Sequence, residues 1–562
     1  MFTRRDFFQM AAAVAALTGA PANLARAAAR QQITQDDLLR FDSLGQVTLL
    51  HFTDLHAQLK PIYFREPSIN IGIGEVAGLP PHITGADLLQ QYGIDSSSAE
   101  AYALSSADFV SLAKSYGKVG GLDRMKTLVD AVRAERSGNT ILLDGGDTWQ
   151  GSYTALASRG EDMVRVMNAL GVDAMTAHWE FTYGTDRVEE LIEGLEFPFL
   201  AGNVRDTEWD EDVFESTATF ERGGMQVAVI GQAFPYTPVA NPRYKIPNWS
   251  FGIQEKRVQQ RVTAARESGA ALVVLLSHNG FDVDRKLASR VEGIDVILTG
   301  HTHDALPQAI EVGNTLLVAS GSHGKFLSRL DIEVGADGVR DFRYRLMPVL
   351  ADAISADPGM TALIDEIRAP HEAELGRVLG RTESLLYRRG NFNGTFDDLI
   401  CQALLAERDA EIALSPGFRW GASLLPGQDI TVEDVYNQTA ITYPNAYRTE
   451  FTGAFLKEVL EDVADNLFNP DPYYQQGGDM VRVGGLGYAI DIAKPIGQRI
   501  SDMVHTGTGK PIEPEKSYVV AGWASVNEGT EGPPIFDVVS RHIEREKTVR
   551  IEENRNINVI SG

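Results

Sequence analysis

Two histidines one residue apart follow a strongly apolar segment in the middle of the chain. The segment Val296–Thr299 predicts a buried strand, Gly300 allows a tight turn, and His301 and His303 follow at once. A loop that leaves the carboxyl end of a strand is where an α/β sheet places a small-molecule site. Alternating histidines on such a loop could bind two adjacent metal ions.

The same pattern, a predicted strand that ends in a metal-binding side chain, recurs along the chain. Asp54 and His56 follow a strand over 46–52, and because they are two residues apart in an extended chain they can chelate one ion. His51 lies inside that strand and is expected to be a core histidine. The remaining candidates at strand ends are Asp147, His178 and His278.

Five of the 11 histidines therefore stand at successive strand ends, which favours a dinuclear metal site over five unrelated core histidines. Imidazole and carboxylate ligands without thiolate suit manganese, iron or zinc, and the ligand types do not choose among them.

The composition narrows the class of partner. At 562 residues the chain is expected to fold into two or three domains. Its formal net charge of -26 argues against nucleic acid or an anionic membrane as partner, because both require an excess of Lys and Arg. An anionic substrate would need local positive charge, which metal ions supply. Cys401 is the only cysteine, so no intramolecular disulfide is expected, and it should be a buried small hydrophobe.

The first 27 residues are typical of an export signal. Arg4 and Arg5 precede an Ala-rich apolar run, and an A-x-A cleavage site follows at 25–27. The paired arginines predict the twin-arginine route to the periplasm, with an ordinary secretory signal as the alternative. No other stretch reaches transmembrane length, so no stable membrane association is expected.

Alternation of strands and helices, with one of the strands predicted over 197–203, indicates an α/β layered domain over 28–355. A long helical stretch at 356–380 is expected to be a linker helix, and a second domain is predicted over 381–562. Residues 57–115 are expected to be irregular and to form a wall of the site.

The order of these motifs resembles the metallophosphoesterases, and within them the 5′-nucleotidase family, which shows D-x-H, G-D, G-N-H-E, H and G-H-x-H in turn. The resemblance implies a four-layer αββα catalytic domain, a linker helix and a 5′-nucleotidase-type C-terminal α/β domain that binds substrate. It also implies two metal ions, which can activate water at neutral pH and clamp an anion. One ion would take Asp54, His56 and His303, the other His178, His278 and His301, with Asp147 bridging the pair.

The departures from that family point to a different reaction. Where the family has G-N-H-E-F-D-Y-G, this chain has His178 in place of the Asn, Trp179 in place of the catalytic His, and Thr182 in place of its partner Asp. A sulfonate carries one charge less than a phosphoryl group, and a sulfur leaving group needs less general-acid help. Trp179 would then exclude water and line a channel, although an ordinary core tryptophan is the alternative.

The second domain departs as well. Both aromatic residues with which the nucleotidases clamp a base are missing from the matching stretches, 443–446 and 528–534. Arg419 matches a substrate-binding arginine of the family and could grip an oxyanion, with a surface salt bridge as the alternative. We expect Arg419 and Asn391, together with the 60–66 segment, to line a channel between the domains.

Taken with the stretch 51–67, these departures resemble the SoxB family of sulfur-oxidation proteins. The resemblance implies a periplasmic thiosulfohydrolase with two Mn²⁺ ions that releases sulfate from a cysteine-linked thiosulfonate on the carrier SoxYZ, with transient contacts to other Sox proteins. The catalytic residues would be Asp147, His178, Trp179 and Arg419. The alternatives are a periplasmic nucleotidase or sugar phosphatase, and a non-catalytic metal-binding or anion-binding protein.

Overall fold

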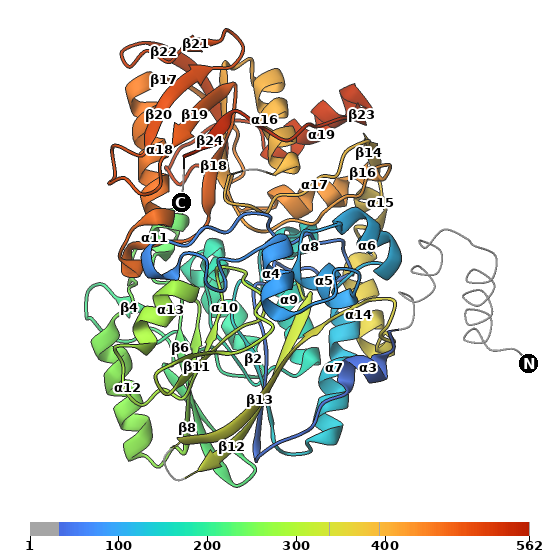
Figure 1. Ribbon diagram of the computed structural model, residues 1–562, viewed down its shortest axis with the longest axis vertical. Helices are drawn as coiled ribbons and strands as arrows, with labels where there is room; N and C mark the ends of the chain where they lie inside the picture. Colours follow the sequence, from blue (N-terminus) through green and yellow to red (C-terminus); the bar gives the residue numbers. More distant parts are fainter. Residues whose placement is uncertain (1–32, 336–337, 393, 561–562) are drawn as a thin grey trace, which may run out of the picture.

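The computed structural model describes residues 33–335, 338–392 and 394–560. Strands β1 to β13 and strands β14 to β24 form separate sheets, and the two sets are stacked along the long axis of the molecule (Figure 1). The export signal predicted over 1–27 lies outside the described residues. Within the described part of the chain, no helix combines the length and the apolarity that crossing a membrane requires.

The first sheet of the N-terminal domain contains three of the strands that end next to predicted metal ligands. The strands β1 (Val47–Phe52), β2 (Thr140–Asp144) and β3 (Ala174–Met175) are parallel, β12 (Phe326–Gly335) is antiparallel to β1, and β13 (Gly338–Pro348) is antiparallel to β12. The strand order is β13, β12, β1, β2 and β3.

The second sheet packs face to face on the first. Leu49 and Leu143 of the first sheet share a core with Val274 and Leu298 of the second. Its central strands are parallel and read as unbroken apolar runs, because both faces of the sheet are covered. The strand order is β10 (Ile310–Val312), β11 (Thr315–Ala319), β9 (Val296–Thr299), β8 (Leu272–Ser277), β6 (Met225–Gln232) and β5 (Thr217–Arg222).

Helices cover the outer face of each sheet, which gives the predicted four layers. Leu50, one residue after Leu49, points to the opposite face and packs with Met125 of α7 (Leu122–Glu135). The helix α9 (Glu161–Leu170) covers the same face, while α12 (Glu255–Glu267) and α13 (Phe281–Ala288) cover the second sheet. Shorter elements are α3 (Gln35–Leu39), α8 (Tyr153–Ser158), η2 (Trp179–Tyr183), α10 (Thr185–Glu193), β4 (Arg205–Asp206), α11 (Thr237–Ala240), η3 (Arg243–Lys245) and β7 (Trp249–Ser250).

Two expectations about local structure were wrong. The segment 57–115 is not irregular throughout, because it contains η1 (Gly74–Val76), α4 (Gly85–Tyr92), α5 (Ala99–Leu104) and α6 (Phe109–Tyr116). Helices of six to eight residues are too short to show a periodic signal. The strand predicted over 197–203 forms only isolated bridges, at Phe199 and Leu200, since Pro198 cannot donate to a ladder.

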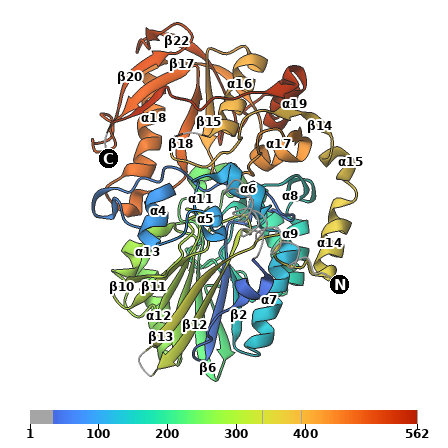
Figure 2. The same ribbon diagram turned by 45° about the vertical axis from the view of Figure 1, so that its right-hand side comes forward.

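The linker is not one continuous helix. It consists of α14 (Pro358–Arg368) and α15 (Glu372–Leu375), which run up one side of the molecule (Figure 2). Pro370 explains the interruption, because it lacks an amide hydrogen and disfavours a helical conformation at the residue before it. The first strand of the second domain begins at Val378 instead of 381.

The C-terminal domain contains three small sheets flanked by helices, in agreement with the α/β prediction. Cys401 is buried in α16 (Thr395–Arg408), as expected. The sheets have the orders β16 (Asp429–Thr431), β14 (Val378–Thr382), β23 (Thr548–Val549); β17 (Tyr447–Thr452), β22 (Ser517–Gly522), β15 (Ile412–Gly417), β18 (Asp479–Gly484); and β21 (Lys510–Pro511), β20 (Ile500–His505), β19 (Leu486–Ile490), β24 (Ile557–Val559). The helices are α16 (Thr395–Arg408), α17 (Val432–Thr439), α18 (Gly453–Phe468), η4 (Pro472–Tyr474) and α19 (Ile535–Glu546).

Candidate metal centre

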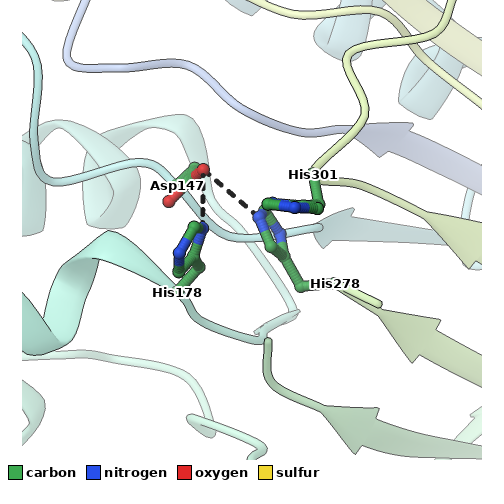
Figure 3. Close-up of side chains that lie close together, drawn as sticks. All are labelled: Asp147, His178, His278 and His301. Carbon is green, nitrogen blue, oxygen red and sulfur yellow. Dashed lines mark hydrogen bonds and ion pairs between the residues drawn. The ribbon is translucent and has the colours of Figure 1, made fainter. Parts of the chain in front are cut away.

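The structure brings all seven predicted metal-ligating side chains together at the carboxyl ends of β1, β2, β3, β8 and β9. They fall into two groups that share Asp147, and within each group the ligand atoms lie within 4.8 Å of one another. The first group is Asp147, His178, His278 and His301 (Figure 3), and the second is Asp54, His56, Asp147 and His303. A carboxylate common to both groups stands where a bridging ligand must stand.

In the first group two imidazole nitrogens converge on one carboxylate oxygen. Oδ2 of Asp147 lies 3.2 Å from Nδ1 of His178 and 3.2 Å from Nε2 of His278. The ring of His278 is held by its other nitrogen, Nδ1, which lies 2.6 Å from the carbonyl oxygen of Gly145. That contact directs Nε2 at the shared carboxylate.

The second group is equally compact. Nε2 of His303 lies 3.1 Å from Oδ1 of Asp54 and 3.1 Å from Nε2 of His56. Nε2 of His56 lies 3.8 Å from Oδ2 of Asp147. Buried imidazole nitrogens and carboxylate oxygens that face one another in this way fit divalent cations with nitrogen and oxygen ligands.

The backbone at these residues is strained. Five of the seven candidate ligands have positive φ angles, a conformation that costs residues other than glycine on the order of 1–3 kcal/mol each. They are Asp54 (52°), His56 (47°), Asp147 (58°), His301 (74°) and His303 (58°). Such strain clusters at functional sites, where the surrounding structure holds it in place.

A buried glutamate holds two of the ligand loops together. The carboxylate of Glu180 accepts hydrogen bonds from the backbone N–H of His178 at 2.7 Å, of Asp147 at 3.2 Å and of Thr148 at 2.6 Å. It therefore joins the loop after β2 to the loop after β3. Glu180 was not among the predicted site residues, although a charged residue two positions after His178 in an apolar stretch is a usable signal.

The carboxylates of the site attract positive charge. Burial would raise the pKa of Asp147, but the neighbouring His178 and His278 hold it well below its usual range. Burial opposes protonation of His278, yet Asp147 and Asp54 raise the pKa of that imidazole to about 10. Burial raises the pKa of Asp54 to about 7. A divalent cation would supply the positive charge that these two buried carboxylates demand.

The other imidazoles are kept neutral, which is the form that binds a metal. Burial lowers the pKa of His56 to about 4 and lowers the pKa of His178, His301 and His303 as well. His51 belongs to neither group and is buried with Nδ1 2.6 Å from Oγ of Ser320, in line with its expected place in the core.

A cavity of about 180 Å³ opens onto both groups and lies between the two domains. Aromatic side chains dominate its walls, and Arg419 is the one Lys or Arg among the described residues that line it. The lining residues that are not candidate ligands include Trp179, Phe234, Tyr236, Val239, Phe418, Arg419, Trp420 and the segment Gln476–Asp479.

Trp179 is buried but reaches this cavity, so it is more than a core residue. Its ring lies edge-on to Phe418 and Trp420, at centroid distances of 5.5 and 5.4 Å, and stacks on Tyr443 at 6.3 Å. Thr182 points elsewhere, with Oγ1 2.6 Å from Oγ1 of Thr442. The two positions of the family's dyad thus carry no acid or base here.

Two predicted substrate contacts are differently placed. Arg419 lines the cavity while Nη1 donates to the carbonyl of Thr302 at 3.1 Å and Nε lies 3.4 Å from Oδ1 of Asp479. Asn391 instead lines a neighbouring cavity of about 50 Å³, and its Oδ1 accepts from the backbone N–H of Ile71 at 2.7 Å.

Residues 60–63 line a third cavity, of about 290 Å³. Asn391 and residues 60–63 therefore do not line the cavity that opens onto both metal groups, although the cavity of Asn391 shares His301 and Arg419 with it.

Comparisons with known proteins agree with this architecture. Residues 378–541 match the family model for the 5′-nucleotidase C-terminal domain. The bovine 5′-nucleotidase is 26% identical over 491 residues, which cover 79% of this chain and 82% of the bovine protein, and the rat 5′-nucleotidase is 26% identical over 472 residues, which cover 75% of this chain and 80% of the rat protein.

Two solved structures from Thermus thermophilus are similar over nearly the full length. A 5′-nucleotidase precursor, 23% identical, covers 92% of this chain and all of that chain, with a TM-score of 0.73, and shares the fold. The structure of a sulfate thiohydrolase SoxB in complex with glycerol has a TM-score of 0.90 at 38% identity, covering 93% of this chain and 98% of that chain. With that identity over almost all of both chains, this protein belongs to the SoxB family, within the 5′-nucleotidase group of metallophosphoesterase hydrolases.

Proposed function

We propose that this protein is a dinuclear-metal thiosulfohydrolase that hydrolyses the terminal sulfonate from a cysteine-linked thiosulfonate. Water adds to the terminal sulfur, the bond between that sulfur and its sulfur neighbour breaks, and sulfate leaves with the oxygen of water. The carrier keeps a persulfide, which takes one proton of water, and the other proton is released to the solvent.

The observation that carries the proposal is Trp179. It stands at the position of the family's catalytic histidine, lines the cavity beside Asp147, and offers neither a base nor an acid. A sulfur leaving group departs as a comparatively stable anion, so its reaction can proceed without the general acid that a phosphate ester requires. The relative named a sulfate thiohydrolase supports the same reaction class.

The chain's own residues divide the work. Asp54, His56 and His303 would hold one metal ion, His178, His278 and His301 the other, and Asp147 both. When bound, a pair of divalent ions supplies Lewis acidity and activates water at neutral pH. We propose manganese, although the ligand types suit zinc and iron equally.

Arg419 is the proposed anion-binding group. Among the described residues its partners are Thr302, through Nη1, and Asp479, through Nε, which leaves Nη2 for a sulfonate oxygen. The rings of Trp179, Phe418 and Trp420 would exclude water and contact the sulfur atoms, since sulfur packs favourably against aromatic rings.

The proposed partner is the carrier SoxYZ. This protein would act in the periplasm, after export by the twin-arginine route. A cavity of about 180 Å³ between two domains admits a thin chain and not a folded protein, which supports a substrate carried on a flexible tail. Transient contacts with other Sox proteins belong to the same proposal, and no nucleic acid is involved.

The test compares two substrates on one preparation of the full chain. Sulfate release is measured from a peptide whose single cysteine bears a thiosulfonate, and phosphate release from AMP, each with and without added Mn²⁺. The proposal requires metal-dependent sulfate release that exceeds phosphate release. Fast AMP hydrolysis without sulfate release would establish the second candidate, a periplasmic nucleotidase or phosphatase, which the ligand set and the names of the curated relatives favour.

A further inference from the structure

A loop of the C-terminal domain reaches across to a candidate metal ligand of the N-terminal domain. Nε2 of His301 lies 2.9 Å from the backbone carbonyl oxygen of Gln476, 175 positions away in the sequence. A carbonyl oxygen can only accept a hydrogen bond, so Nε2 carries the proton and the neutral ring keeps its lone pair on Nδ1. This contact fixes both the tautomer and the direction of the ring.

We infer that the Gln476 carbonyl is a positioning group for His301, so that retention of one metal ion depends on the docking of the C-terminal domain. The inference rests on the proposed metal centre but not on the reaction proposed for it. Hydrogen-bond partners of metal-binding histidines fix ring orientation, and their loss typically weakens metal binding about 10–100-fold.

His278, another ligand of the first group, also has a ring nitrogen next to a backbone carbonyl, but this carbonyl belongs to its own domain. Nδ1 of His278 lies 2.6 Å from the carbonyl oxygen of Gly145, which belongs to the loop after β2. His301 differs because its carbonyl partner comes from the second domain. The first metal group is therefore held from both domains.

The loop that contains the carbonyl is anchored on the N-terminal domain. We call the residues Asp471–Gly478 the strap. Nζ of Lys286 lies 2.6 Å from Oδ1 of Asp471, and the hydroxyl of Tyr473 donates to Oε2 of Glu255 at 2.8 Å. The hydroxyl of Tyr236 donates to the carbonyl oxygen of Tyr473.

The inner end of the strap is fixed as well. The backbone N–H of Gln476 donates to the carbonyl of Asn466, in α18, at 3.0 Å. The carbonyl that faces His301 therefore belongs to a peptide segment held at both ends. It is a fixed acceptor and not a chance neighbour.

The same ligand loop is held at a second point from the C-terminal domain. The carbonyl oxygen of Thr302, between the two ligand histidines, accepts from Nη2 of Arg389 at 3.0 Å and from Nη1 of Arg419 at 3.1 Å. Docking of the C-terminal domain thus restrains both the ring of His301 and the peptide that follows it.

Two adjacent glycines of the strap provide a matched pair of substitutions. Both have left-handed backbones, with φ of 75° at Gly477 and 80° at Gly478, so alanine is strained at either position. A Cβ at Gly477 would lie 2.3 Å from Nε2 of His301, whereas a Cβ at Gly478 would have the carbonyl oxygen of Gly417 as its nearest neighbour, at 3.6 Å. Only the first substitution therefore displaces the imidazole.

The experiment measures metal retention by the full chain. The parent protein, Gly477→Ala and Gly478→Ala are stripped of metal, reloaded with Mn²⁺ alone or Zn²⁺ alone, and dialysed against graded chelator before elemental analysis. We expect Gly477→Ala to retain one of two ions about 10–100-fold less well, and Gly478→Ala to match the parent. Circular dichroism of the metal-free proteins checks that each is folded.

Equal retention in Gly477→Ala and the parent would overturn the inference, and so would an equal loss in Gly478→Ala. Should Gly477→Ala fail to fold, Lys286→Ala releases the outer anchor of the strap, with Arg285→Ala as the control next to it. Lys286→Ala must then hold one ion less well than Arg285→Ala. A parent protein that holds two ions but releases no sulfate would overturn the proposed reaction and leave this inference standing.

Discussion

The backbone N–H of Trp179 donates to Oδ1 of Asp147 at 2.8 Å. The residue at which the chain departs most from the family pattern therefore also helps to fix the carboxylate that both metal groups share. Because that bond comes from the main chain, the side chain at 179 can be changed without removing it. A substitution at position 179 can therefore change the chemistry of the cavity and leave the geometry of the metal centre intact.

The first prediction uses that separation. Trp179→His should keep the fold and the metal content and should gain phosphomonoesterase activity, since a positioned acid or base contributes roughly 10²–10⁴-fold. AMP hydrolysis and sulfate release are measured together. Trp179→Phe is the control, because it preserves an aromatic wall but supplies no proton. Unchanged activity of Trp179→His toward both substrates would contradict the prediction.

A second prediction concerns Asp147 itself. Asp147→Asn should lose at least one metal ion and nearly all turnover, because a neutral amide cannot balance two cations. The loss should exceed the roughly 10–100-fold that removal of an outer hydrogen-bond partner costs. Elemental analysis decides the matter, and full metal content in the variant would show that Asp147 does not bridge. Asp144→Asn is a useful control, because this carboxylate is buried at the end of β2, three residues before Asp147, but lies outside both metal groups.

Arg419 is predicted to bind the sulfonate. Arg419→Ala should lower kcat/KM for sulfate release about 10–100-fold, the size expected for one hydrogen bond between charged groups. Arg419→Lys should recover only part of this, because lysine lacks the planar fork. Metal content must be measured in parallel, since Nη1 also holds the carbonyl of Thr302. A variant with full metal and unchanged kcat/KM would show that the arginine serves structure alone.

The pH dependence of stability is predicted at a site far from the metals. Burial and the neighbouring Asp397 raise the pKa of Asp398 to about 7, against about 3.9 for an unfolded aspartate. The folded state binds this proton more tightly, so the stabilisation it provides is lost as pH rises through about 7. Asp398→Asn should therefore raise the apparent unfolding temperature above that of the parent at pH 8, with a smaller difference at pH 5. Equal differences at the two values would contradict the assignment.

The metal-ligand candidates could be predicted from the sequence because each directly follows a strand. Carboxyl ends of parallel strands meet at one edge of a sheet, so Asp54, Asp147 and His178 had to be neighbours once β1, β2 and β3 paired. Their spacing indicated that Asp54 and His56 could share one ion, whereas the division of the other ligands between two ions was implied by the family resemblance. The family and the four layers followed from the same motifs and their order.

Only the tertiary structure decided what surrounds those ligands. The carboxylate of Glu180 accepts from backbone N–H groups of another loop, a pairing that only the fold shows. Every residue has a backbone carbonyl, so no sequence signal distinguishes that of Gln476, which faces His301. The position of Asn391 outside the main cavity depends on how the two domains pack. Residue types and local spacing therefore determine the ligands, while the cavity and its supports arise from contacts between segments that are distant in the sequence, from 32 residues for Glu180 and Thr148 to 175 for His301 and Gln476.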